Sequence, residues 1–186
     1  MCSSDLVNSA VTTAQTFNTP LQLLGAFTAT NDGTGLLSFN GGISLASGGT
    51  AGQFTVAGAG NTAINGAFAA GAVTQLVMNG SGTLTLAATN SLTVGAGLLG
   101  GTTVVNAVNG LGTTALAFGD FSLTNAITPT ANLIVNANQT FNGAGGLVVQ
   151  TNSTTANTAA CTVRMTRSLP RTRKAICAAS SKERWR

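Results

Sequence analysis

Short apolar alternations recur along the chain, each bounded by Gly, Asn, Ser or Thr. The clearest are LLSF at 36–39, ISL at 43–45, FTV at 54–56, LTL at 84–86, LTV at 92–94 and LIV at 133–135. β-branched residues flanked by turn formers are typical of short strands joined by tight turns. No window carries a sustained i, i+3, i+4, i+7 apolar stripe, so we expect no helix longer than two turns.

The short runs also recur with a longer period. One apolar series has steps of 20, 21, 20, 20 and 19 residues: Leu23, Ile43, Ile64, Leu84, Val104 and Leu123. The tetrapeptide QTFN at Gln15–Asn18 returns at Gln139–Asn142, close to six such steps later. A single coil of short strands cannot bury its inward face, whereas stacked coils bury it jointly.

The pattern therefore predicts an all-β protein, a parallel β-solenoid (β-helix) of about seven coils. At the strand-pairing distance of about 4.8 Å per coil, this is a rod roughly 30 Å long. Small inward residues would fill a narrow core, and Gly and Asn would occupy the corners, where φ can be positive.

An antiparallel sandwich or meander is the alternative fold. Five Asn-Gly pairs begin at positions 40, 65, 79, 109 and 142, and Asn-Gly is the strongest short hairpin signal. LLSF-NG-GISL and QLVM-NG-SGTLTL each read as a hairpin. These pairs are irregularly spaced, whereas the apolar series is regular, and this difference favours the solenoid.

Composition divides the chain into three segments. Residues 1–6, MCSSDL, resemble a translated sequencing adapter, and we treat them as a non-native leader. Residues 7–163 form the repeat region and contain all 24 glycines. Residues 164–186 hold all eight Lys and Arg residues and the only Trp. A frameshift, a native basic tail that binds anionic lipid or nucleic acid, and a linker to a further domain all fit this tail. We favour the frameshift and expect a disordered segment.

The repeat region is almost free of charge. The whole chain is 44% hydrophobic but only 6% charged. Between Val7 and Val163 the ionisable acids are Asp32 and Asp120, and no Lys or Arg occurs. Apolar content of this size supports a packed core. A nucleic-acid-binding body would need a basic stripe, and this region has none.

One segment carries a family resemblance. Gly80 to Ala107 reads GSGTLTLAATNSLTVGAGLLGGTTVVNA, which resembles the passenger-associated repeats of autotransporters, and NGAGGLVVQTN at 142–152 looks like the start of another copy. The chain is also similar to repeats of filamentous-haemagglutinin-like adhesins. The resemblance implies a parallel β-helix exported to the cell surface. The extra Leu98-Leu99 departs from the family spacing, and Ser91 and Leu92 stand where an aromatic is frequent. We expect an internal fragment of a longer protein.

Few residues of this chain could act in catalysis or bind a metal ion. Asp32 and Asp120 are 88 residues apart, about four predicted coils or roughly 20 Å, whereas the carboxylates of a glycosidase lie within about 10 Å. We expect both to be solvated turn residues. The chain has no His, and its three cysteines, at 2, 161 and 177, lack metal-site spacing. We therefore predict no catalytic residue, no metal ligand and no cofactor.

Two further patterns, the Gly-rich segments and the Phe residues, are explained by turns and packing without a ligand site. GAGLLGG at 95–101 and GAGG at 143–146 mimic phosphate loops, but neither is followed by the Lys that such a loop requires, so we expect turns. The eight Phe residues are far apart, and we expect them to pack in the core or at corners rather than to form a carbohydrate-stacking row. No apolar window is long enough for a membrane-spanning helix.

These observations favour a non-enzymatic structural passenger or stalk segment of an exported bacterial surface protein. Its partners would be other segments of the same full-length protein, with no nucleic acid and no membrane span. One alternative is an adhesin module whose Thr, Asn and Ser faces contact glycan, a host surface or ice. Another is a catalytically inert relative of β-helix enzymes that act on polysaccharides.

Overall fold

The computed structural model describes residues 9–119 and 131–141 in full, and the backbone alone of strands β1 (Ser4–Val7), β15 (Leu147–Val149), β16 (Ala160–Met165) and β17 (Ala175–Ala178). Every regular element in these residues is a β-strand, so the all-β prediction is confirmed. No helix in them is suited to crossing a membrane. The tail beyond Met165, apart from β17, and the leader before Ser4 lie outside the described residues.

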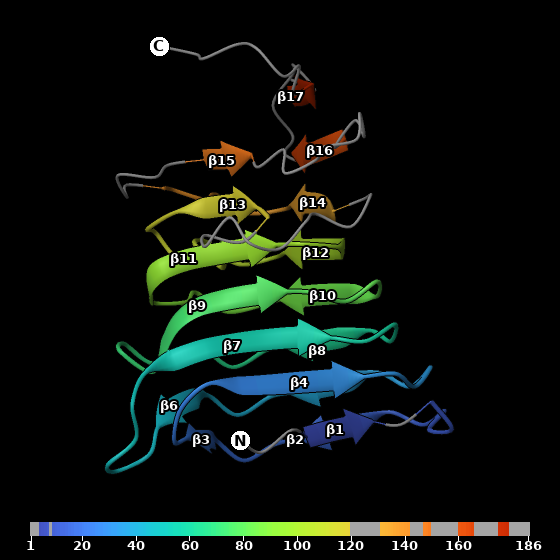
Figure 1. Cartoon of the computed structure of the whole chain (residues 1–186), viewed down its shortest axis with the longest axis vertical. Coiled ribbons are helices and arrows are strands. Elements are labelled where there is room, and N and C mark those ends of the chain that lie inside the picture. The colour runs from blue at the N-terminus through green and yellow to red at the C-terminus, as the bar shows by residue number, and fades with distance from the viewer. Residues whose placement is uncertain are drawn as a thin grey trace.

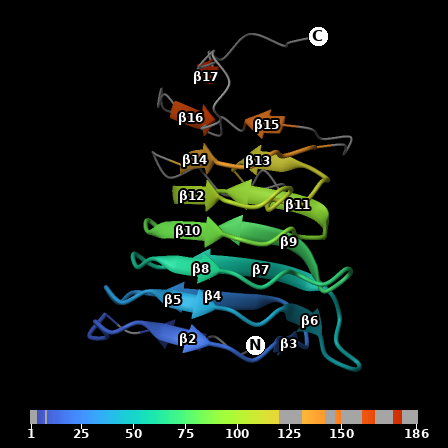
Figure 2. The same ribbon diagram turned by 180° about the vertical axis from the view of Figure 1, so that it is seen from behind.

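Two long sheets run along the molecule, sheet A at the front in Figure 1 and sheet B at the front in Figure 2, and each new strand lies on the strand of the previous turn. Sheet A joins β1, β4 (Phe27–Asn31), β7 (Gly52–Ala57), β9 (Val73–Met78), β11 (Leu92–Leu98), β13 (Leu116–Phe118) and β15. Sheet B joins β2 (Gln15–Phe17), β5 (Leu37–Phe39), β8 (Thr62–Ile64), β10 (Thr83–Leu86), β12 (Gly101–Val105), β14 (Ala131–Val135), β16 and β17. A short third sheet pairs β3 (Leu21–Leu23) with β6 (Ile43–Leu45).

The strands pair in parallel, apart from β16 with β17, and the chain alternates between sheets B and A. This arrangement is a parallel β-solenoid, as predicted. Residues 9–119 make about five turns, a count that differs slightly from the seven coils predicted for residues 7–163. One sheet B column, meaning residues stacked in successive turns, runs in steps of 22, 25, 22, 19 and 30 residues: Phe17, Phe39, Ile64, Leu86, Val105 and Val135.

The regular apolar series does not follow one column. Leu23 pairs with Leu45 in the third sheet, whereas Ile64 lies in sheet B beside Phe39. The second QTFN is not equivalent to the first either. Gln15–Phe17 forms β2, whereas residues 139–141 follow β14 without forming a strand. Loops of unequal length connect strands that stay in register, and a constant spacing therefore misassigns the turns.

The hairpin alternative is wrong. β5 and β6 flank Asn40-Gly41 but belong to different sheets, and β9 and β10 flank Asn79-Gly80 in the same way. In these places Asn-Gly marks a corner of the solenoid. Among the described non-glycine residues, Asn109 has a positive φ, of 50°, and asparagine tolerates that region better than most residues.

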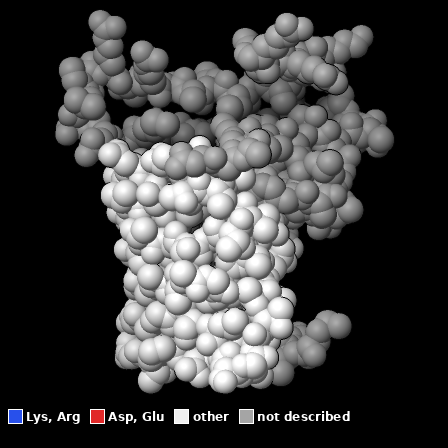
Figure 3. All heavy atoms as spheres, turned by 90° about the vertical axis from the view of Figure 1, so that its left-hand side faces the viewer, with Lys and Arg blue, Asp and Glu red and all other residues white. Residues whose placement is uncertain are grey.

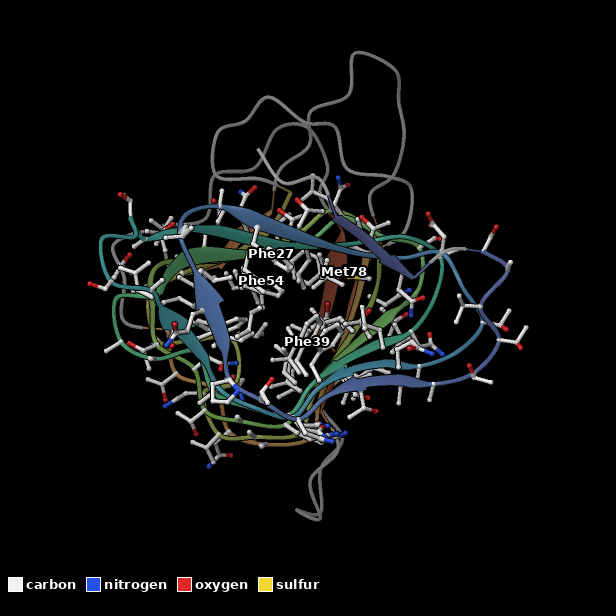
Figure 4. All side chains as sticks on the ribbon, turned by 90° about the horizontal axis from the view of Figure 1, so that it is seen from below. Phe27, Phe39, Phe54 and Met78 are labelled. Carbon is white, nitrogen blue, oxygen red and sulfur yellow. The ribbon has the colours of Figure 1, made fainter. Side chains whose placement is uncertain are left out.

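The core lies between the sheets and changes character along the axis. Figure 4 shows Phe27, Phe39, Phe54 and Met78 inside the ring of strands. Aromatic rings pack there, with Phe39 and Phe54 6.1 Å apart between centroids and Phe54 and Phe68 5.3 Å apart. Phe17, which is exposed, stacks on Phe39 at 5.3 Å from the end of the core. The turns that follow use Leu76, Met78, Leu84, Leu86 and Leu98, all buried. The prediction of core packing is confirmed for Phe39, Phe54, Phe68 and Phe118, and Phe27 and Phe141 are partly buried against the same core. The prediction is wrong for Phe17, which is exposed, and Phe121 lies outside the described residues.

Two threonines interrupt this apolar core. An inward column of sheet B contains Leu37, Thr62, Leu84, Thr103 and Leu133. Both threonine hydroxyls are buried and have no hydrogen-bond partner. An unsatisfied buried hydroxyl costs free energy because it has lost its bonds to water.

Replacing Thr103 with Val should therefore stabilise the chain. Val has nearly the same shape but no hydroxyl to desolvate, and we expect the free energy of unfolding to rise by about 1 kcal/mol. Urea unfolding followed by circular dichroism measures the change. Thr102→Val is the matched control on the neighbouring, half-buried residue, expected within about 0.5 kcal/mol of the parent. Equal effects at the two positions would contradict this interpretation.

Glycines form columns of their own at the corners. A Cβ on Gly60 would collide with the carbonyl oxygen of Gly33, and a Cβ on Gly82 with that of Gly60. Gly66 meets Gly41 in the same way at another corner. The reason is steric, because one backbone turn lies directly on the next and no room remains for a side chain.

Gly82→Ala should therefore destabilise the solenoid. We expect a loss of about 2 kcal/mol, the cost typical of overpacking, because the added Cβ meets rigid backbone. Gly25→Ala is the control, since nothing lies within 4 Å of its Cβ position. Thermal unfolding of the two variants should show a lower midpoint for Gly82→Ala alone. A similar loss in both would refute the steric explanation.

Candidate functional site

The described surface is almost without charge. Across residues 9–119 and 131–141, Asp32 is the single charged side chain. In Figure 3 the described atoms on the visible face belong to neither charged class. Candidate sites must therefore be sought among Asp32, exposed amides and hydroxyls.

Asp32 lies at the corner after β4, beside a hollow of about 280 Å³ lined by Asp32, Gly33, Thr34, Ala59, Gly60 and Asn61. Its side chain is exposed, as predicted for a solvated turn residue. The other predicted turn acid, Asp120, lies outside the described residues, so the distance between the two carboxylates stays a prediction. No cluster of three acidic, Cys or His side chains suited to a metal occurs in the described part of the chain.

A buried amide shapes this corner from beneath. Asn31 is fully buried, and its Oδ1 accepts a hydrogen bond from the Gly33 N–H at 3.1 Å. Its Nδ2 donates to the Gly35 carbonyl at 3.1 Å and to the Asn61 carbonyl of the next turn at 2.7 Å. Asn31 thus bonds to the backbone of two turns, both of its N–H donors are engaged, and the side chain is fully buried. The hollow presents one carboxylate among backbone, hydroxyl and amide groups.

Exposed amides form a column at the corner after sheet B, which we call the asparagine column. Its amides are Asn18, Asn40, Asn65, Asn106 and Asn136, and Ala87 occupies the equivalent position in the turn between Asn65 and Asn106. Asn40 Nδ2 donates to Asn18 Oδ1 at 2.9 Å, and Asn65 Nδ2 donates to Asn40 Oδ1 at 2.8 Å. Asn136 Nδ2 donates to Asn106 Oδ1 at 2.7 Å. Ala87 interrupts the column between these two runs.

A second group of amides links turns from within. Asn90 is buried, and its Oδ1 accepts a bond from Phe68 N–H at 3.0 Å while its Nδ2 donates to the Gly110 carbonyl at 2.6 Å. Gln139 joins Leu111 N–H and the Ala107 carbonyl in a similar way, at 3.2 and 2.8 Å. These side chains replace strand hydrogen bonds where the backbone leaves the sheets.

Sequence reasoning missed the asparagine column, although a signal was present. Asn directly follows a large apolar residue in Phe17-Asn18, Phe39-Asn40, Ile64-Asn65, Val105-Asn106 and Val135-Asn136. The expectation of turns at 95–101 was also wrong in part. Gly95 and Gly97 belong to strand β11, where Gly95 has φ 139° and packs on Ala115 of the next turn. Residues 143–146 lie outside the described residues.

Searches of protein-family models, curated proteins and solved structures find no match to this chain. The resemblance to autotransporter and haemagglutinin-like repeats stays a prediction.

The asparagine column should contribute to stability. Asn40→Ala removes a bond to each neighbouring turn, and we expect the free energy of unfolding to fall by about 1–2 kcal/mol, at about 1 kcal/mol per bond. Ala87→Asn should raise it by a similar amount by joining the two runs. Asn79→Ala is the control, because this exposed corner amide makes no side-chain hydrogen bond in the described structure. Chemical unfolding of the three variants decides the matter, and a loss at Asn79 equal to that at Asn40 would contradict it.

Proposed function

We propose that this chain is a structural stalk or passenger segment of an exported bacterial surface protein, located at the cell surface and without catalysis of its own. One observation carries the proposal. Sheets A and B each connect every turn to the turns before and after it through parallel strand pairing. Such a rod bears load and sets distance along a single axis.

Length in this architecture is additive. At about 4.8 Å per turn, five turns span roughly 24 Å, and each further turn adds the same rise. Neighbouring turns alone are in contact, as in other repeat proteins, so a longer chain extends the rod without rearranging it. That property suits a spacer which holds another module away from a surface.

The lack of charge also fits an extracellular spacer. The stability of a fold depends on pH through its ionisable groups, and the fully described ranges contain one, Asp32. Salt screens charge interactions, and these ranges have almost none to screen. We therefore expect the stability of these ranges to change little with the pH or the salt concentration of the medium.

The repeat-like segment gives further support. Its GSGTLTL part contributes β10 and its GGTTV part contributes β12, which pair in register from Thr83 with Thr102 to Leu86 with Val105. One copy of the sequence unit therefore advances the rod by one turn. An autotransporter-like passenger repeat would behave in this way.

Single-molecule pulling between tags at the two ends tests the load-bearing role. We expect stepwise extension, one turn at a time. Turns of 19 to 25 residues would release roughly 65–90 Å each at about 3.5 Å per residue. Gly82→Ala should lower the force of the steps, and Gly25→Ala should not. Extension without resistance would remove the basis for a stalk.

Surface display tests the location. Placed between a signal peptide and an autotransporter barrel in a laboratory bacterium, the chain should reach the outside and become accessible to added protease. Retention inside the envelope would count against an exported passenger.

An adhesin module is the second candidate. The exposed amides of the asparagine column, and the Gln53 and Gln75 amides joined at 3.2 Å on sheet A, form regular polar rows that resemble a glycan-contact surface. Saturable binding to a glycan array or to host matrix, lost in Asn40→Ala but kept in Asn79→Ala, would favour this function over a stalk alone.

A further inference from the structure

Asn-Gly pairs are chemically fragile as well as turn-forming. The backbone nitrogen of the glycine can attack the Asn side-chain carbon Cγ, and glycine offers the least steric hindrance to this attack. The new N–C bond closes a five-membered succinimide, and the amide nitrogen leaves as ammonia. Water then opens the ring to aspartate or isoaspartate. The reaction needs no oxidant or reductant, and any hydrogen bond that holds the asparagine side chain or the glycine nitrogen must break before the attack.

Three of the four pairs in the fully described ranges are restrained. In the asparagine column, Asn65 Nδ2 donates a hydrogen bond to Asn40 Oδ1, and Asn40 Nδ2 donates one to Asn18 Oδ1. The glycine nitrogens that would attack are also engaged, Gly41 N with Phe17 O at 3.3 Å and Gly66 N with Phe39 O at 3.1 Å.

Asn109-Gly110 is held in a comparable way. Asn109 Oδ1 accepts a bond from Thr140 N–H at 2.9 Å, and Gly110 N donates to the Ala107 carbonyl at 3.2 Å. Attack within this pair therefore also requires two hydrogen bonds to break first.

Asn79-Gly80 differs from the other three. It follows strand β9 at the corner after sheet A, and the Asn79 side chain is exposed. The backbone N–H of Asn79 donates to Val56 O at 2.8 Å. Gly80 is buried, and within the described residues neither its nitrogen nor the Asn79 side-chain amide makes a hydrogen bond.

We propose that Asn79 is the site of spontaneous deamidation in the folded chain, with water as the co-reactant and an aspartate or isoaspartate as the product. The product places a carboxylate on a rod whose fully described ranges hold one other, Asp32. Isoaspartate also lengthens the backbone at a tight corner, where Gly80 packs on the Gly58 carbonyl. The modification therefore adds a negative charge at this corner and weakens the packing between two turns.

Peptide mapping by mass spectrometry tests this proposal. The folded 186-residue chain is incubated in mildly alkaline buffer at physiological temperature and digested with pepsin, because the repeat region has no Lys or Arg for trypsin. We expect the mass gain of amide loss to appear first at Asn79. Asn40, Asn65 and Asn109 should react more slowly, by roughly fivefold for each hydrogen bond that must break.

Incubation in concentrated urea provides the control, because unfolding should bring the four rates together. Asn40 or Asn65 reacting as fast as Asn79 in the folded chain would overturn the proposal. A ranking that urea leaves unchanged would overturn it too, since local sequence and not the fold would then set the rates.

Two variants test the mechanism of protection. Asn79→Gln should abolish the first phase of mass gain. Asn40→Ala removes the acceptor of Asn65 Nδ2, and we expect Asn65 to react about fivefold faster while Asn79 is unaffected. Circular dichroism of each variant confirms that the chain is folded. An unchanged Asn65 rate in folded Asn40→Ala would show that the column does not protect its members.

Discussion

The structure depends on the parallel pairing of one turn with the next at about 4.8 Å. At that distance each residue lies almost directly above its counterpart in the turn before. The molecule is therefore organised in columns, and the environment of a residue is set mainly by its column neighbours. Phe17 against Phe39, Asn40 against Asn65 and Gly60 against Gly82 are three expressions of the same constraint.

Column packing explains the composition. Corners where backbone lies on backbone admit glycine alone, so a chain with several such corners needs many glycines. Amides suit an outward column, because each carries both a donor and an acceptor and can bond to a copy of itself above and below. Charges suit a column poorly, because identical charges would face one another in successive turns. The scarcity of charged residues in the described ranges fits this constraint.

Asparagine has two opposite properties in this fold. In the asparagine column its amide adds hydrogen bonds along the axis and is held in place by them. At Asn79 the same residue before the same glycine lies at a corner of sheet A without such bonds. The dipeptide is identical in the two settings, and its chemical stability differs because the neighbouring turn differs. A stalk with a long working life would depend on this protection at most of its corners.

The sequence by itself determined the class of structure: short strands, turn-rich connections, an apolar core without charge, and stacking in preference to hairpins. Those features depend on residue type and short-range alternation, which are visible along the chain. The even spacing of about 20 residues was misleading, because Leu23 and Ile64 occupy different sheets while loops of unequal length restore the register.

Only the tertiary structure decided which residues share a column, and hence which hydroxyls, amides and glycines matter. Thr103 is buried without a partner and Thr102 beside it is not, although both lie in one run of threonines. Asn31 and Asn90 bond across turns 20 to 30 residues away, which no local pattern encodes. The physical reason is that residues share a column when their strands pair in register. That register depends on the length and path of the entire turn between the two strands, and not on the residues adjacent in the sequence.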